Sequence, residues 1–114
     1  MEEERMDYKR KVIIKRPDEK YGHVTNISTS LKNLQKTVDG YIEIVTVLNN
    51  PKVVMICNEE GKLKNLQRNF RMGMTFPDII RGTVIICGAD GDDLADIPID
   101  FDCWKMLLKS WGNV

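Results

Sequence analysis

Alternation of apolar and polar positions near the start of the chain predicts a first strand. Val12 and Ile14 fall on one face of the segment 8–16, and Lys11 and Lys15 fall on the other. A period of two is typical of a strand with one buried and one solvated face. We therefore expect this strand to have one wet face and to lie at an edge of a sheet.

The next pattern changes from a strand period to a helix period. A turn at Gly22 leads into a short second strand, residues 23–27. Three serine and threonine residues at 28–30 then offer N-cap oxygens. Apolar residues at 31, 34 and 38 follow at helical spacing, and Asp39-Gly40 ends the helix, with Gly40 suited to a left-handed cap.

Three strongly apolar segments predict the middle of the sheet. Residues 41–48 are rich in β-branched side chains, which predicts a central strand. The turn at residues 49–51 makes the segment 53–57 an antiparallel neighbour of that strand. The continuous apolar run at residues 83–87 predicts another interior strand.

Two further segments have helical spacing. Leu63, Leu66 and Phe70 share one face of the segment 62–72, which predicts a short helix or an irregular segment beside the sheet. Near the end of the chain, Asp100 or Asp102 can cap a last helix. An apolar stripe follows on that helix, made up of Phe101, Trp104, Leu108 and Trp111. Its tryptophans predict either the lid of a small core or an interface with a partner.

These elements sum to an α+β domain with about five strands, mainly antiparallel. One helix lies between strands two and three, and one helix lies at the C-terminus. Residues 1–7 are acidic without a core pattern and predict a frayed or disordered terminus, so the single domain is expected at residues 8–114.

Composition excludes several classes of protein. The formal net charge is zero, which disfavours general binding to nucleic acid or to an anionic membrane surface. No apolar run approaches the ~18 residues of a membrane span. Three cysteines, an odd number, fit no disulfide framework and favour a reducing compartment, so we expect a cytoplasmic protein.

The basic and acidic residues are unevenly distributed. Basic residues crowd the segment 9–16, and six aspartates fall between residues 90 and 102. Either both segments are simply solvated, or they form a head-to-tail or self-complementary contact between subunits. A domain this small gains stability from pairing, so we expect a homo-oligomer.

A polar cluster follows the buried strand at residues 53–57. Asn58, Glu59 and Glu60 can accept hydrogen bonds from hydroxyl groups or from the edge of a nucleobase. The alternative is a solvated turn in which Asn58 binds its own backbone. Adjacent glutamates of an extended chain point to opposite sides, so they are unsuited to one metal ion.

Basic residues follow this cluster closely in the sequence. In a helix, Lys64, Arg68 and Arg71 share one face, and arginine binds phosphate with two parallel hydrogen bonds. Asp78 and Arg81 flank the last interior strand and can line the same rim. The alternative for each of these groups is an ordinary solvated surface.

Other catalytic and metal chemistry has little support. His23 is the single histidine, and no cysteine or aspartate stands beside it at ligand spacing, so a zinc site or a nucleophile–histidine pair is not expected. The acidic segment at residues 88–93 lacks the spacing of a calcium loop. We expect no metal and no cofactor.

The chain resembles a family of small domains of unknown function, numbered 3846, from phages, plasmids and conjugative elements. The resemblance covers residues 11–88, and its most specific part is the segment Cys57 to Leu63, which reads CNEEGKL. Other matches are Ser30-Leu31, Gly40-Tyr41-Ile42, Asn69, Asp78-Ile79-Ile80 and Gly82-Thr83. The chain departs from the family where Gln67 replaces a proline and Phe70 replaces an arginine. The resemblance implies an accessory gene of a phage or mobile element that acts against host defence.

From these observations we predict a non-enzymatic protein that binds a small, nucleotide-derived ligand. The predicted ligand-binding residues are Asn58, Glu59, Glu60, Lys62, Arg68, Asn69, Arg71, Asp78 and Arg81. One alternative is an interaction module that inhibits a host protein through the Trp104–Trp111 helix or the acidic loop. Another is a nucleotide hydrolase with Glu59 or Glu60 as its general base.

Overall fold

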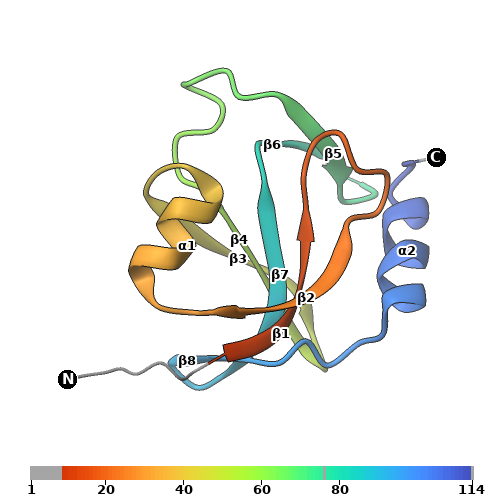
Figure 1. Ribbon diagram of the computed structural model, residues 1–114. Coiled ribbons are helices and arrows are strands. Elements are labelled where there is room, and N and C mark those ends of the chain that lie inside the picture. The colour runs from red at the N-terminus through yellow and green to blue at the C-terminus, as the bar shows by residue number, and fades with distance from the viewer. Residues whose placement is uncertain (1–8, 76, 114) are drawn as a thin grey trace.

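A computed structural model describes residues 9–75 and 77–113. Its elements are β1 (Lys9–Lys15), β2 (His23–Ser28), α1 (Leu31–Val38), β3 (Ile42–Asn49), β4 (Lys52–Asn58), β5 (Arg68–Met72), β6 (Asp78–Arg81), β7 (Val84–Asp90), β8 (Asp93–Ala95) and α2 (Phe101–Ser110). The main sheet has the order β2-β1-β7-β4-β3, and β8 also pairs with β7 (Figure 1). Every pairing is antiparallel. The predicted α+β class, with a helix between the second and third strands and a helix at the end, is confirmed.

The main sheet is covered on both faces. Helix α1 packs on one face, over a core that includes Val54, Ile56 and Ile85. Helix α2 and the separate β5–β6 hairpin cover the other face, over a core that includes Val53, Met55 and Ile86 (Figure 1). Because both faces are buried, β4 and β7 are apolar without alternation, as strands between two covering layers must be.

Two positions in the sheet differ from the prediction. The first strand is not at an edge, because β1 lies between β2 and β7. Ile13 and Lys15, on its supposedly wet face, are buried together with Val12 and Ile14. Strand β3 is not central, since it forms one edge of the sheet beside β4.

The helix caps follow from local chemistry. The Ser30 hydroxyl accepts a hydrogen bond from the Asn33 N–H at 3.2 Å, and the Asp100 carboxylate accepts one from the Cys103 N–H at 2.8 Å. The left-handed residue after α1 is Asp39 (φ 64°), where we expected Gly40. Gly40 has a different role, described with the site below.

The segment after β4 forms turns and then a strand. Of the two alternatives predicted for it, the short helix is absent, and the first part of the segment is irregular. Turns occupy most of residues 59–65, and residues 68–72 form β5, which pairs with β6. Consequently Lys64, Arg68 and Arg71 do not share a helical face. The strand places Phe70 in the core, where its ring lies 5.8 Å from Trp104 and 6.2 Å from Trp111.

The two tryptophans of the last helix belong to the core. Trp104 is fully buried, and its indole N–H donates to the Tyr21 carbonyl at 2.8 Å. Trp111 packs against both Phe70 and Trp104. The interpretation as a core lid is therefore correct, and the tryptophans do not form an exposed face for a host protein.

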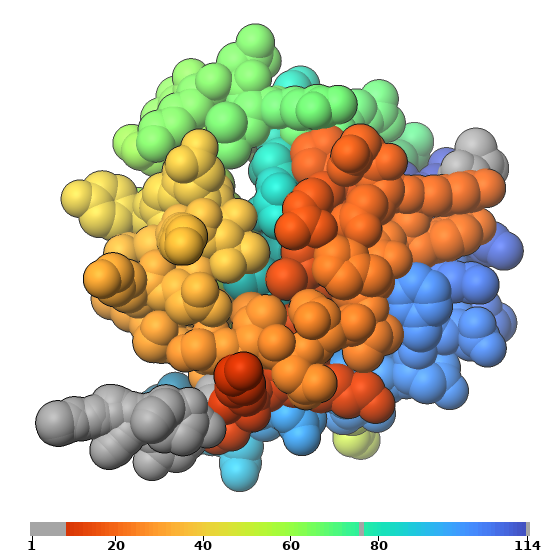
Figure 2. Space-filling view, in the orientation of Figure 1, coloured from red at the N-terminus to blue at the C-terminus, as the bar shows by residue number. Residues whose placement is uncertain are grey.

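The face carrying α1 has a hollow in its surface. Figure 2 shows it between α1 and the β1–β2 hairpin, with residues of the β6–β7 region at its bottom. The predicted frayed terminus at residues 1–7 lies outside the described residues. No helix in the described ranges is long and apolar enough to cross a membrane.

Candidate functional site

A pocket of about 270 Å³ lies between the β3–β4 end of the sheet and the β5–β6 hairpin. Its floor is apolar, and its rim is charged. The floor and walls include Val45, Met55, Cys57, Leu63, Met72, Ile79 and Ile80. The charged lining residues are Glu43, Glu59, Lys62, Asp78 and Arg81. A concave apolar site with a few convergent polar groups is the usual form of a small-molecule site.

One carboxylate and one amine of the rim neutralise each other. Lys62 Nζ forms an ion pair with Asp78 Oδ1, and both side chains are more than half exposed. Arg81 donates from Nη1 to the Leu66 carbonyl at 3.1 Å. A guanidinium has five N–H donors, so this contact leaves most of its donors for a ligand.

The other two rim carboxylates are not engaged within the protein. Among the residues described, neither Glu43 nor Glu59 has a side-chain hydrogen bond or an ion pair. Glu43 reaches the pocket from β3, and Glu59 reaches it from the turn after β4. These carboxylates can accept hydrogen bonds from hydroxyl or amino groups of a ligand.

Cys57 lies at the bottom of the pocket and is a poor nucleophile. Its burial, together with the nearby charges of Glu43 and Asp78, raises the pKa of its thiol to about 11. The thiol is therefore protonated near neutral pH, whereas the thiolate is the reactive form. Its Sγ lies 3.8 Å from the Glu43 carbonyl, its hydrogen-bond acceptor.

Asn58, although it borders the pocket, is tied to the end of α1. Its side-chain amide donates to the carbonyls of Val38 and Asp39 at 3.1 and 3.0 Å. Its Oδ1 accepts from the Glu60 N–H at 2.7 Å. Asn58 thus joins a helix C-terminus to a strand end, and both of its amide protons are used.

Gly40 is required beside this amide. A Cβ at Gly40 would lie 2.6 Å from Asn58 Nδ2, closer than carbon and nitrogen can approach without a shift. The Gly40-Tyr41-Ile42 segment and the Asn58 motif therefore meet in space. Their shared function at this point is to fix α1 against the sheet.

Glu60 points away from the lining of the pocket. Its carboxylate lies 3.8 Å from Lys64 Nζ, an ion pair four residues apart in which both partners are about half exposed. Such a pair adds little to stability. Of the predicted polar cluster, Asn58 and Glu59 line the pocket, and only Glu59 has a side chain without a partner among the described residues.

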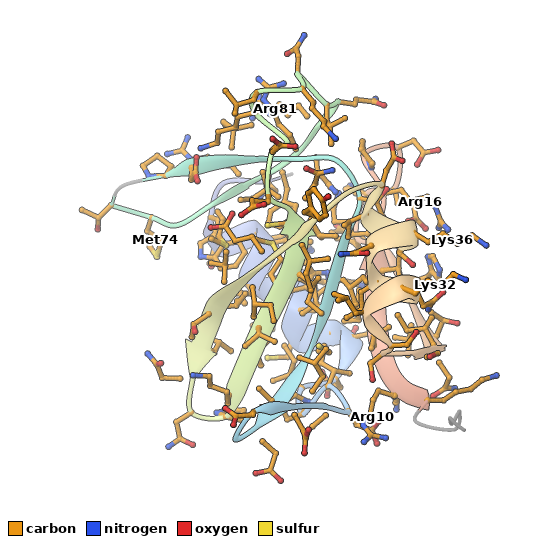
Figure 3. The ribbon with its side chains drawn as sticks, turned by 90° about the vertical axis from the view of Figure 1, so that its left-hand side faces the viewer. Arg10, Arg16, Lys32, Lys36, Met74 and Arg81 are labelled. Carbon is orange, nitrogen blue, oxygen red and sulfur yellow. The ribbon has the colours of Figure 1, made fainter. Side chains whose placement is uncertain are left out.

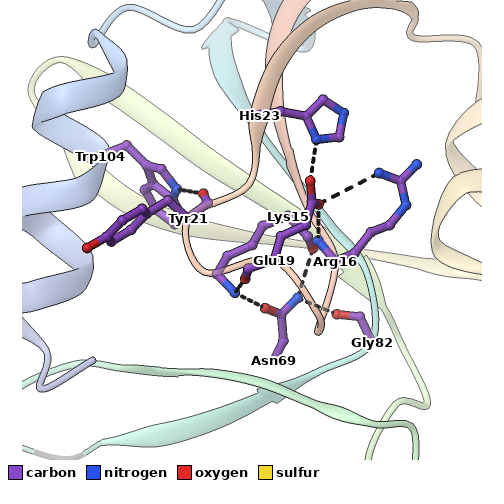
Figure 4. A network of polar contacts seen from close by, with 8 residues as sticks. All are labelled: Lys15, Arg16, Glu19, Tyr21, His23, Asn69, Gly82 and Trp104. Carbon is purple, nitrogen blue, oxygen red and sulfur yellow. Dashed lines mark hydrogen bonds and ion pairs between the residues drawn. The ribbon is translucent and has the colours of Figure 1, made fainter. Parts of the chain in front are cut away.

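Asn69 does not line the pocket and lies in a separate polar junction with Lys15 and Glu19 (Figure 4). Its Oδ1 accepts from Lys15 Nζ at 2.6 Å, and its amide donates to the carbonyls of Lys15 and Gly82 at 2.8 and 2.7 Å. Lys15 also donates to the Glu19 carbonyl at 2.7 Å. The junction fastens β5 to β1 and to the connection between β6 and β7.

Burial alone shifts the pKa values of Lys15 and Glu19 in opposite directions, but the net pKa shift of both groups is downward. It lowers the pKa of the Lys15 amine, and the charges of Glu19 and Asp18 oppose the shift only in part. Burial also disfavours the Glu19 carboxylate, but hydrogen bonds from the Arg16 backbone and from His23 outweigh it and lower the pKa of Glu19. The His23 ring lies 2.7 Å from Glu19, so His23 belongs to this structural network.

The two arginines of β5 do not reach the pocket. Arg68 is exposed and lies opposite Arg81 in the hairpin register. Arg71 lies beside the end of α2, where its backbone exchanges hydrogen bonds with the Asn113 side chain at 3.0 and 2.8 Å. The structure therefore brings together Asn58, Glu59, Lys62, Asp78 and Arg81, and it separates them from Glu60, Arg68, Asn69 and Arg71.

Other basic side chains gather on the α1 side of the molecule. Figure 3 shows Arg16, Lys32 and Lys36 projecting from that side, away from Met74 at the tip of the β5–β6 hairpin. They cannot supply positive charge to the pocket. In the part of the chain that the structure describes, no cluster of three or more His, Cys, Asp or Glu side chains could hold a metal ion.

The sequence did not predict Glu43 or the apolar wall residues as part of the pocket. The strand alternation marks Glu43 as a polar position on an apolar strand, but its partner depends on the hairpin register. That register shifts between Thr46 and Leu48, which moves Glu43 opposite Cys57. A bulge of this kind leaves no clear signal in one sequence.

The fold and the pocket define a small antiparallel α+β domain with a candidate small-molecule site at one end of its sheet. A family model described as "Domain of unknown function (DUF3846)" matches residues 9–107, and the chain belongs to that family. Comparisons with curated proteins and with solved structures find no match.

Proposed function

We propose that this protein binds a small nucleoside-like ligand in the pocket between β3–β4 and the β5–β6 hairpin, without catalysing its conversion. The observation that carries the proposal is the pair of unengaged carboxylates, Glu43 and Glu59, above an apolar floor. A nucleobase can lie against apolar side chains, and ribose hydroxyls or exocyclic amines can donate to carboxylates.

The charges of the pocket restrict how many phosphates such a ligand can carry. The rim has three carboxylates and two cationic groups, and one cation is paired with Asp78. Arg81 is left to bind an anionic group. These charges favour a nucleoside or a ligand with one phosphate over a polyphosphate. The volume, about 270 Å³, is near the lower end of ligand sites and also favours a small ligand.

Binding without turnover is supported by the residues at the bottom of the pocket. The Cys57 thiol, with its pKa raised to about 11, is not activated as a nucleophile. His23 lies in the Lys15 junction, away from the pocket lining. In the setting that the phage and plasmid resemblance implies, capture of a nucleotide-derived host signal would counter host defence.

Isothermal titration of the purified protein with a panel of nucleosides and nucleoside monophosphates tests this proposal. We expect one site per chain and at least a tenfold weaker affinity in the double variant Glu43→Gln and Glu59→Gln. The matched control is Glu60→Gln, since Glu60 neighbours Glu59 but does not line the pocket. Its affinity should equal that of the wild type.

Three outcomes contradict the proposal. The first is the absence of heat with every ligand of the panel, and the second is an equal loss of affinity in Glu60→Gln. The third is chemical conversion of a bound ligand, detected by mass spectrometry after heat release, which would indicate an enzyme. Capture of a stoichiometric host protein, with no small molecule bound, would favour the interaction module instead.

A further inference from the structure

Strand β3 has an open edge. It pairs with β4 on one side, and on its other side no strand lies among the described residues (Figure 3). The strand is eight residues long and contains neither proline nor lysine, the residues that commonly protect sheet edges. Its one irregularity is the register shift between Thr46 and Leu48.

Hydrogen bonding to β4 determines which backbone groups of β3 face outwards. The Glu59 N–H donates to the Tyr41 carbonyl at 2.8 Å, just beyond the Ile42–Asn58 pair. In antiparallel pairing, hydrogen-bonded residues alternate with residues whose N–H and C=O point the other way. Residues 41, 43 and 45 therefore bond to β4, and the backbone groups of residues 42, 44 and 46 point away from the sheet.

The side chains along this edge are apolar and exposed. Tyr41 is 68% exposed and Ile44 is 52% exposed. The charged side chain of the strand is Glu43, on the pocket face. The edge thus combines outward-pointing backbone groups with apolar side chains, which is the combination that an added strand requires.

We infer that a second copy of this chain adds its β3 to this edge, antiparallel, with Ile44 opposite Ile44 of the second copy. In this register Ile42 faces Thr46 and Glu43 faces Val45, so no two like charges lie opposite along the regular part of the strand. Moving the two strands by two residues can instead place Glu43 opposite Glu43, a destabilising pair. The strand is therefore complementary to a second copy of itself, which is the occupant we infer.

This pairing would bring the second copy to the pocket. Glu43 and Val45 of β3 line the pocket, and Val45 of the second copy would lie directly across from Glu43. The assembly would then have two pockets beside one continuous sheet, each bordered by both chains. The inference concerns the free protein and does not depend on which ligand, if any, the pocket holds.

Cysteine cross-linking tests the register. The background variant is Cys103→Ser, since Cys103 is exposed while Cys57 and Cys87 are buried. Residues opposite each other in a hydrogen-bonded antiparallel pair have Cα atoms about 5.5 Å apart, within the range that a disulfide spans. Ile44→Cys should therefore form a covalent dimer under mild oxidation. Val24→Cys, on the opposite edge strand β2 and 41% exposed, is the control and should remain uncross-linked.

Light scattering coupled to size exclusion tests the assembly without any cysteine. At tens of micromolar the wild type should have the mass of a dimer, and Ile44→Lys should be a monomer because two ammonium groups would lie opposite each other. Circular dichroism checks that the variant is folded, and Val24→Lys is the matched control that stays dimeric. A wild type that is monomeric at every concentration overturns the inference. A dimer that survives Ile44→Lys, or that cross-links equally through Val24→Cys, does so too.

Discussion

The polar junction around Asn69 and the pocket rim around Glu59 show two different uses of polar side chains. At the junction, the Asn69 side chain makes three hydrogen bonds, two of them to backbone carbonyls. At the rim, Glu43 and Glu59 have no side-chain partner among the described residues. Asn69 and Glu59 were both predicted to bind a ligand, but only Glu59 lines the pocket.

The difference lies in burial and in what the folded chain leaves exposed. A buried polar group must be satisfied by the protein itself, because water cannot replace a missing partner. Asn58, which is buried, and Asn69, which is half-buried, are satisfied in this way and hold elements together. An exposed carboxylate beside an apolar floor keeps its acceptors for another molecule. A polar motif in a sequence therefore indicates a site only where its side chains are not used by the fold.

The largest effect should follow from Asn69→Ala. The substitution removes three hydrogen bonds and leaves the buried Lys15 amine and two carbonyls with fewer partners. We expect the free energy of unfolding to fall by about 3 kcal/mol, measured by urea denaturation. Asn26→Ala, at an exposed position of β2, is the control and should change stability by less than about 0.5 kcal/mol. Equal stability of the two variants would refute the structural role of Asn69.

A somewhat smaller effect is expected for Asn58→Ala. It removes the two amide hydrogen bonds to the end of α1 and the acceptor for the Glu60 N–H. We expect a loss of about 2 kcal/mol in the free energy of unfolding. Glu59→Ala is the adjacent control, with a change of less than about 0.5 kcal/mol, because its side chain is exposed.

Gly40→Ala tests the close contact between Gly40 and the side-chain amide of Asn58 while Asn58 itself is kept. The added methyl group would displace the Asn58 amide from its position, so this variant should also be destabilised, by about 1 to 2 kcal/mol. In a double variant with Asn58→Ala the two losses should be less than additive, because the clash with the amide is removed while only the backbone strain of alanine at φ 157° remains. Full additivity would contradict the contact between Gly40 and Asn58.

Much of the fold could be predicted because its signals are local. The apolar runs of β4 and β7, the Ser30 and Asp100 caps and the stripe of α2 are all visible in the sequence, and the structure contains them. Positions within the sheet could not be predicted, since edge or centre depends on long-range pairing. Lys15 suggested a wet face, yet it is buried because Asn69, 54 residues away, accepts its hydrogen bond.

The candidate site was only partly predictable for a related reason. Glu59, Lys62, Asp78 and Arg81 line the pocket as a group, as their position near strand ends indicated. Arg68 and Arg71 were placed with them by assuming a helix, and the strand β5 separates them. The helical spacing of Leu63, Leu66 and Phe70 was the misleading signal. Strand β5 has five residues, which are too few for the two-residue period of a strand to be recognised against that helical spacing.

The last prediction compares how the two regions respond to pH. The folded pKa of Lys15 lies below its unfolded value of 10.5, so the unfolded state binds more protons between those values. The contribution of Lys15 to stability therefore rises as pH increases toward 10.5. The folded pKa of Cys57, about 11, lies above its unfolded value of 9.0, so its contribution is lost as pH rises from 9 to 11. Each slope is at most about 1.4 kcal/mol per pH unit, the limit for one proton.

Urea denaturation of the wild type, Lys15→Met and Cys57→Ala at several values between pH 8.5 and 10.5 measures these opposite trends. The stability of the wild type relative to Lys15→Met should increase with pH, and its stability relative to Cys57→Ala should decrease. Differences between variants are needed, because burial also raises the pKa of Cys87, to about 12, and adds a falling trend common to all three proteins. Parallel pH profiles for the two variants would mean that the amine in the junction and the thiol under the pocket are not buried as described. Opposite profiles would support both parts of the comparison. The buried junction disfavours the charged form of the Lys15 amine, and the apolar pocket floor keeps the Cys57 thiol protonated.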